Sequence, residues 1–294
     1  MEQKEKQDSF IPTNDYVFKR IFGCKGNEII TKGLLNAILD EEVKEIDLDK
    51  NPITEKDLYD DKIGILDVKA VLNNEISCDI EMQVATQENI EERILFYWSK
   101  MYIKNIHEGN EYGNLRKCIA ILIADFELDR FKNIQKSHTK WKLREEEFSK
   151  SILTDVCEIH IISLTKLKEL ISKNKLPEKE EKLKIWGRFL VSPKELGESD
   201  MENDEALKKA KEEYDAISQD EHEQYLAELR MKHIMDSKAI EKYGYRKGKE
   251  DGEKSGAKKE KIEIAKEMLK NGADIDFISK CTKLSKEEIL KLNA

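Results

Sequence analysis

Long uninterrupted apolar runs are missing from this 294-residue chain, in which 39% of the residues are hydrophobic and 38% are charged. No stretch reaches the roughly 18 apolar residues of a membrane-spanning helix. The charged N-terminus also lacks the apolar segment of a secretory signal. We therefore expect a protein that works in the cytoplasm without a membrane partner.

The spacings that mark several familiar sites are absent as well. The five cysteines form no metal-like pairs, and the five histidines have no ligand-like spacing with them, which argues against zinc and for reduced thiols. The glycine-rich phosphate-binding motifs are missing, so no nucleotide cofactor is expected. The G-x-S-x-G pattern of serine nucleophiles is missing too.

The net charge of −9 gives no overall attraction to nucleic acid, although a local basic patch would be enough for binding. Acidity of this kind also suits a protein that gathers carboxylates around a divalent cation. The chain does contain such a set of carboxylates.

Two predicted strands, over residues 63–72 and 76–84, form a hairpin whose turn holds Asn73 and Asn74, because asparagine tolerates positive φ. Polar and apolar residues alternate along both strands, so one face of the hairpin is polar. The polar face carries Asp67, Lys69, Asp79, Glu81 and Gln83.

Two interpretations of this face are open. One is a sheet with a solvated side, on which acidic residues only add solubility. The other is a divalent-metal site in which Asp67 and Glu81 bind Mg²⁺ through their oxygens, since close carboxylates are unfavourable without a cation. Gln83 would then orient a water or a phosphate oxygen by hydrogen bonding.

The remaining periodicity predicts an α/β domain of about 190 residues. Two helices are expected within 13–39, the first beginning at a Thr13 or Asn14 cap. Further helices are expected over 87–108, between 126 and 158, over 165–173 and over 178–191, with strands over 118–126 and 158–164. The run at 118–126 is almost wholly apolar, as in a central strand buried on both faces.

Beyond residue 192 the chain becomes charge-dense. Residues 193–240 are expected to be a charged helical segment, and 241–261 a linker. Glycine recurs there every four residues, which favours a fraying connector over a packed helix interface. Residues 262–294 resemble a small helix-turn-helix. Their six lysines and six acidic residues form no marked basic face, so packing or self-association is the alternative to DNA reading.

Taken together, several segments resemble the PD-(D/E)XK nuclease family transposases, also called the recombination-promoting nuclease (Rpn) family. The opening helix "TNDYVFKRIFG" is similar to the start of that family, and "ILDVKA" followed by "IEMQ" is similar to its acidic motif. The long helix and central strand within 92–128, the glycine tract and the C-terminal helices continue the likeness in the same order. The resemblance covers nearly the whole chain.

This resemblance implies a restriction-endonuclease-like core over residues 1–192, with a mixed sheet flanked by helices and a mainly helical C-terminal region. It also implies DNA cleavage that depends on Mg²⁺, with Mn²⁺ as an alternative. Asp67 and Glu81 would be the metal ligands, and Gln83 stands where the wider superfamily usually has a lysine. A homodimer is expected, because cutting both strands commonly takes two active sites.

Other residues have two interpretations each. Asp15 would reach the metal from the first helix, or would only favour the helix dipole. Arg93 and Tyr97 would contact DNA phosphates, or would belong to a solvated helix face, and Lys69 would approach the same anion. The main functional alternative is a non-catalytic DNA-binding or assembly protein that retains the fold. An RNA nuclease ranks below both, because no aromatic stacking motif is recognisable.

Overall fold

The computed structural model describes residues 10–49, 67–85, 89–105 and 115–292, which belong to two compact units, Met1–Ile234 and Met235–Ala294. A six-stranded mixed sheet in the order β1-β2-β3-β4-β6-β5 forms the centre of the first unit. The strands are β1 (Ile46–Leu48), β2 (Val68–Leu72), β3 (Ile76–Gln83), β4 (Cys118–Ala124), β5 (His138–Trp141) and β6 (Cys157–Ser163).

The centre of the sheet is parallel and its edges are antiparallel. Strand β4 runs parallel to both β3 and β6, while β1, β2 and β5 pair antiparallel with their neighbours. All seven residues of β4 are buried, which explains its nearly continuous apolar sequence. The mixed sheet and its helices agree with the restriction-endonuclease-like fold expected from the sequence.

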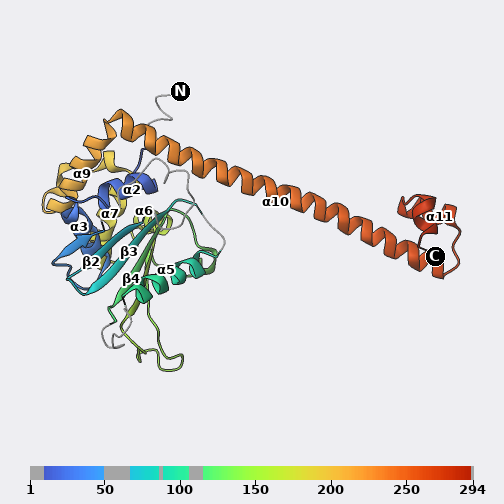
Figure 1. The fold of residues 1–294 in the computed structure, drawn as a ribbon, viewed down its shortest axis with the longest axis horizontal. Coiled ribbons are helices and arrows are strands. Elements are labelled where there is room, and N and C mark those ends of the chain that lie inside the picture. The colour runs from blue at the N-terminus through green and yellow to red at the C-terminus, as the bar shows by residue number, and fades with distance from the viewer. Residues whose placement is uncertain (1–9, 50–66, 86–88, 106–114, 293–294) are drawn as a thin grey trace. The chain divides into compact units, whose positions relative to one another are not determined.

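Helices cover both faces of the sheet (Figure 1). On one face, α2 (Asp15–Phe22), α3 (Glu28–Ile38), α6 (Leu164–Ser172), α7 (Glu181–Val191) and α9 (Glu205–Ser218) contribute to the main hydrophobic core. On the other face, α5 (Ile90–Lys104) packs Ile90 and Ile94 over residues of β4 and β6. The sheet thus separates two hydrophobic layers.

Local signals in the sequence account for two of these elements. Asn14 caps α2, since its side chain accepts a hydrogen bond from the backbone of Tyr16. Asn73 and Asn74 join β2 to β3 with φ angles of 49° and 62°, the left-handed geometry that a tight hairpin turn requires. The hairpin prediction is confirmed from Asp67 onward, while residues 63–66 lie outside the described residues.

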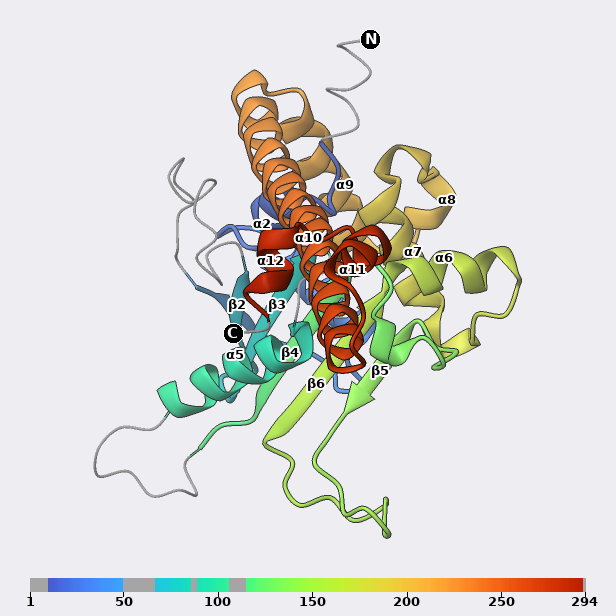
Figure 2. The same ribbon diagram turned by 90° about the vertical axis from the view of Figure 1, so that its right-hand side faces the viewer.

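Two edge strands were not predicted, and one predicted helix is wrong. Between residues 126 and 156 the chain forms a 3₁₀ turn at Asp129–Phe131, strand β5 and an extended connection, but no α-helix. This connection, residues 142–156, leaves the sheet as a loop bridged by Arg144 and Ile152 (Figure 2). Strand β5 forms because it pairs with β6, and local periodicity does not predict it.

The expectations for the charged region need correction. Helix α9 buries Leu207, Ala210 and Tyr214 in the main core, so this part of 193–240 belongs to the packed first unit. The fraying connector expected over 241–261 is also wrong, since one helix, α10 (Glu221–Lys270), runs through the segment. The free-energy cost of the glycines does not interrupt helix α10.

The second unit has a small core of its own. Ala265 of α10, Ile278 of α11 (Ile275–Thr282) and Ile289 of α12 (Lys286–Leu290) are buried together with Leu284. This arrangement agrees with the helical C-terminal region expected over residues 262–294, although its first helix is the end of α10. Within the described parts of the chain, no helix is long and apolar enough to cross a membrane.

Candidate functional site

The carboxylates predicted from the hairpin lie on the face of the sheet that α5 covers. In the parallel register of β3 with β4, Asp79 pairs with Ala120 and Glu81 with Leu122, and both apolar partners belong to the core under α5. Asp67 is 6% exposed, and Asp79 and Glu81 are each 8% exposed. The solvated-face interpretation therefore fails, because these carboxylates are buried.

Two oxygens in this cluster have no hydrogen-bond partner among the described residues. They are Oδ2 of Asp67 and Oδ1 of Asp79. Burial raises the pKa of Asp67 well above its usual value, and the neighbouring charges of Asp79 and Glu81 raise it further. Burial likewise raises the pKa of Asp79 to about 6. The cluster therefore favours either protons or a cation.

Glu81 is held by its neighbours. Its Oε1 accepts a hydrogen bond of 2.7 Å from Nε2 of Gln83 and also pairs with Nη2 of Arg93. Burial raises the pKa of Glu81, and the Arg93 guanidinium opposes that effect. Arg93 also lies over the Tyr97 ring, 5.7 Å from its centroid, and the charge of Glu81 acts on Tyr97. Both predicted phosphate-binding residues therefore lie near Glu81.

Asp15 lies near this cluster but is engaged elsewhere. Its charge contributes to the raised pKa of Glu81. Its Oδ2 pairs with Arg230 of α10 at 2.7 Å, and its Oδ1 accepts from the backbone N–H of Tyr16 at 2.9 Å. The second contact matches the helix-end role considered for Asp15. Its role as a metal ligand stays a prediction.

Two lysines, Lys69 and Lys19, approach the cluster, and only Lys69 was expected there from the sequence. Lys69 faces Asp79 across the hairpin and opposes the rise in the pKa of that carboxyl. Lys19 of α2 is buried, and its Nζ donates to the backbone oxygen of Asp67 at 2.8 Å. The only signal for Lys19 was its place in the opening helix that carries the family resemblance.

A divalent cation fits this donor set only in part. Carboxylate oxygens are the ligands that Mg²⁺ prefers, and the unpartnered oxygens of Asp67 and Asp79 are suitable donors. Oε1 of Glu81 could bind the cation only after Arg93 and Gln83 release it. Across the described ranges, no three His, Cys, Asp or Glu side chains are already arranged as a ligand set.

Comparison with known families identifies the domain around this cluster. The profile described as "PD-(D/E)XK nuclease family transposase" matches residues 12–244. The chain belongs to this family. A second profile, "Rpn/YhgA-like nuclease family, C-terminal HTH domain", matches residues 258–294. No curated protein and no solved structure matches the chain.

The family assignment confirms the resemblance seen in the sequence. The first match includes the whole carboxylate cluster, so the cluster lies in a PD-(D/E)XK nuclease family domain. The second match agrees with the helix-turn-helix likeness of residues 262–294 and begins four residues earlier, at residue 258.

Proposed function

We propose that this family member is a DNA endonuclease that hydrolyses phosphodiester bonds with Mg²⁺, or alternatively Mn²⁺. The observation that carries the proposal is the pair of buried, unpartnered oxygens of Asp67 and Asp79 beside Glu81, within a nuclease family domain. Buried carboxylate oxygens without a hydrogen-bond partner are costly and neighbouring carboxylates repel one another, so we infer that the cluster binds a cation.

Asp67 and Glu81 would hold the metal. The carboxylate of Asp79, which lies beside them, would also be stabilised by the positive charge of the cation. The bound cation would lower the pKa of an attacking water and offset charge on the phosphate. Gln83 is a neutral amide, so it orients a water or a phosphate oxygen and removes no proton. Its hydrogen bond to Glu81 supports this role.

Arg93 would contact the DNA phosphate. Its guanidinium already lies at the edge of the cluster, paired with Glu81, and Tyr97 packs beside it. Planar guanidinium groups suit phosphate oxygens as well as carboxylates. Lys69, which faces Asp79, would add a second positive charge near the same phosphate.

The C-terminal unit would supply further DNA binding, since its profile is that of a helix-turn-helix domain. A homodimer would place two centres on the two strands of a duplex. The transposase description of the family supports a link to recombination or mobile elements as part of the same proposal.

Cleavage of supercoiled plasmid tests the proposal. We expect nicking or linearisation by the wild type with Mg²⁺ or Mn²⁺, and none in EDTA. Asp67→Asn and Glu81→Gln keep the side-chain shape but remove the charge, so each should slow cleavage by at least about 100-fold. Glu92→Gln is the matched control, because Glu92 lies on α5 beside Arg93 with a side chain that is 63% exposed.

The competing function is a non-catalytic DNA-binding or assembly protein. It is favoured by the ion pairs of Glu81 with Arg93 and of Asp15 with Arg230, which neutralise these two carboxylates without a metal. If neither the wild type nor any variant cuts but the wild type binds the plasmid, this alternative replaces the endonuclease. Equal cutting by wild type and both variants would instead show that the activity does not come from this cluster.

A further inference from the structure

One side of helix α5 carries a row of cationic and aromatic side chains that are exposed or half-buried. Its members recur every three or four residues, so they are neighbours on the helix surface. This α5 row consists of Arg93, Phe96, Tyr97, Lys100 and Lys104. Of the two acidic residues of the helix, Glu91 lies on another side, and Glu92 pairs with Arg130 at 4.0 Å. The row therefore has an excess of positive charge.

One end of the α5 row lies at the carboxylate cluster. Arg93 pairs with Glu81 and lies over the Tyr97 ring, 5.7 Å from its centroid. Burial raises the pKa of Tyr97, and the charges of Glu81 and Asp67 add to that effect, so the ring lies near both carboxylates. A strand bound along the row would therefore reach the proposed metal site.

The α5 row continues away from the cluster through two lysines. Lys100 and Lys104 are exposed, and neither has an ion-pair or hydrogen-bond partner among the described residues. With a rise of 1.5 Å per residue, Lys104 lies about 16 Å along the helix axis from Arg93. Cations spread over that length suit successive phosphates of one strand, because a single phosphate would contact only one of them.

Phe96 supplies an apolar ring among these cations. It is 59% exposed, and it lies three residues after Arg93 and four before Lys100. Its ring meets that of Tyr97 edge-on, with centroids 5.4 Å apart and an interplanar angle of 80°, which supports its orientation. Exposed aromatic rings beside cations are the surfaces on which proteins stack the bases of single-stranded nucleic acids. In a duplex the faces of most bases are covered by neighbouring base pairs.

We propose that the α5 row binds a DNA strand whose bases are unpaired, with its phosphates along Arg93, Lys100 and Lys104 and one base stacked on Phe96. Three cations with no acidic residue among them match the charge of a phosphate backbone. The inference rests on the proposed function, for which it names the substrate as DNA with a single-stranded segment at the carboxylate cluster. Phe96 would then determine specificity for unpaired DNA, and the two lysines would add affinity for any DNA.

Fluorescence anisotropy of the full chain in EDTA, where cleavage does not interfere, tests the α5 row with a labelled DNA single strand and the matching duplex. The single strand should bind about tenfold more tightly. Phe96→Leu keeps an apolar side chain but removes the ring, so it should weaken single-strand binding by about tenfold and leave duplex binding nearly unchanged. Lys100→Ala and Lys104→Ala should weaken binding of both DNAs. Each should also reduce the salt dependence, lowering the slope of log K against log salt for the single strand by about 0.7.

Phe148→Leu and Lys150→Ala are the matched controls, since both change exposed residues in the loop between β5 and β6. Both should bind as the wild type does. Equal affinity for the two DNAs, or equal weakening by Phe96→Leu and Phe148→Leu, would overturn the proposal.

Light scattering on the same variants tests the other use of an exposed apolar ring, a contact between copies of the chain. If Phe96→Leu lowers the molecular mass in solution and leaves DNA binding unchanged, the proposal is overturned. The proposed endonuclease fails separately: selective single-strand binding that depends on Phe96, without cleavage in Mg²⁺ or Mn²⁺, would support the α5 row as a DNA-binding surface and remove the enzyme. Cleavage of plasmid by a protein whose DNA binding ignores Phe96 would do the reverse.

Discussion

At the scale of single residues, the alternation of the hairpin was enough to predict which carboxylates share a face. It could not predict that the face is buried, because α5 is a separate element whose packing depends on β4 and β6. For the same reason Asp79 was expected on the polar face but not among the metal ligands. Its unpartnered oxygen and raised pKa follow from burial, which no local pattern reveals.

Lys19 is the residue at which the structure adds most to the sequence. Burial lowers the pKa of Lys19, and the nearby carboxylate of Asp67 opposes this effect, so the carboxylates help to keep its ammonium charged. We predict that Lys19→Met will slow plasmid cleavage by about tenfold or more. It should also lower the free energy of unfolding by about 1–3 kcal/mol, because the buried oxygen of Asp67 loses its donor.

The control for this change is Lys25→Met, which removes an exposed lysine just beyond α2. Denaturant unfolding and initial cleavage rates should be measured on both variants, with Lys19→Arg as a test of the charge alone. Unchanged cleavage by a destabilised Lys19→Met protein would show that Lys19 only supports the fold.

At the scale of elements, the sequence predicts best those segments whose two faces differ or whose faces are both apolar. Strands β3, β4 and β6 are of this kind, and so are helices α5 and α7. Strand β1 has only three residues, and the "HTKW" of β5 is polar and half exposed at the sheet edge. These two segments are strands because they pair with β2 and β6. Local periodicity does not predict such pairing.

The glycines of α10 provide a prediction at this scale. A Cβ atom at Gly248 or Gly252 would meet nothing within 4 Å, and both residues lie inside the helix. Alanine at either position should therefore stabilise the helix by about 1 kcal/mol. Hydrogen exchange of the amides in residues 244–256 should become slower, and unchanged exchange would contradict a stable helix there.

Gly272→Ala is the matched control, with the opposite expected sign. Gly272 follows α10 with a φ of 76°, a left-handed conformation that strains any residue with a Cβ. This variant should lower the stability of the C-terminal helices although its Cβ also meets open space. The pair of results separates helix propensity from steric contact.

At the scale of the first unit, contacts between distant parts of the sequence complete the core. Tyr16 donates to Glu223 at 2.6 Å, Arg20 pairs with the same carboxylate at 2.9 Å, and Arg230 pairs with Asp15. These contacts join α2 to the start of α10 across more than 200 residues of sequence. They explain why the charged segment after residue 192 could not be assigned to the core from its composition.

Charge networks of opposite effect determine how stability responds to pH. In the carboxylate cluster, burial raises the pKa of Asp79 to about 6 from an ordinary 3.8. Its protonated form therefore adds stability below about pH 3.8, and this contribution is lost as the pH rises through 6. Around Glu158 the sign is reversed, because His160, Lys140, Lys117 and Lys142 lower the pKa of that carboxyl well below 4.5 against its burial.

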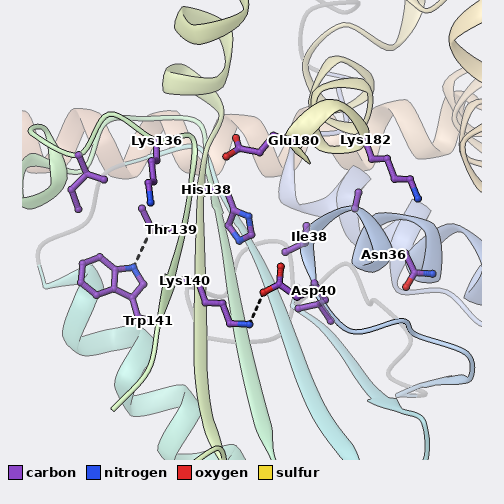
Figure 3. A pocket seen from close by; sticks show the side chains of 13 residues that line it. Asn36, Ile38, Asp40, Lys136, His138, Thr139, Lys140, Trp141, Glu180 and Lys182 are labelled. Atoms are coloured by element: carbon purple, nitrogen blue, oxygen red, sulfur yellow. Dashed lines mark hydrogen bonds and ion pairs between the residues drawn. The ribbon is translucent and has the colours of Figure 1, made fainter. Parts of the chain in front are cut away.

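Glu158→Gln isolates the second contribution. Glu158 is 2% exposed and pairs with Lys140 at 2.9 Å and with Lys142 at 3.2 Å, so losing its charge removes their buried counter-ion, while Lys140 keeps Asp40 (Figure 3) and Lys142 keeps Asp155. We predict a loss of about 1.5–3 kcal/mol in the free energy of unfolding at pH 7, the range for hydrogen bonds to a charged group. Because the folded pKa is lowered, the difference from wild type should be constant above about pH 5.5 and shrink as the pH falls below 4.5. Urea unfolding from pH 3.5 to 8 measures this difference, and a difference that grows on acidification would contradict the assigned network.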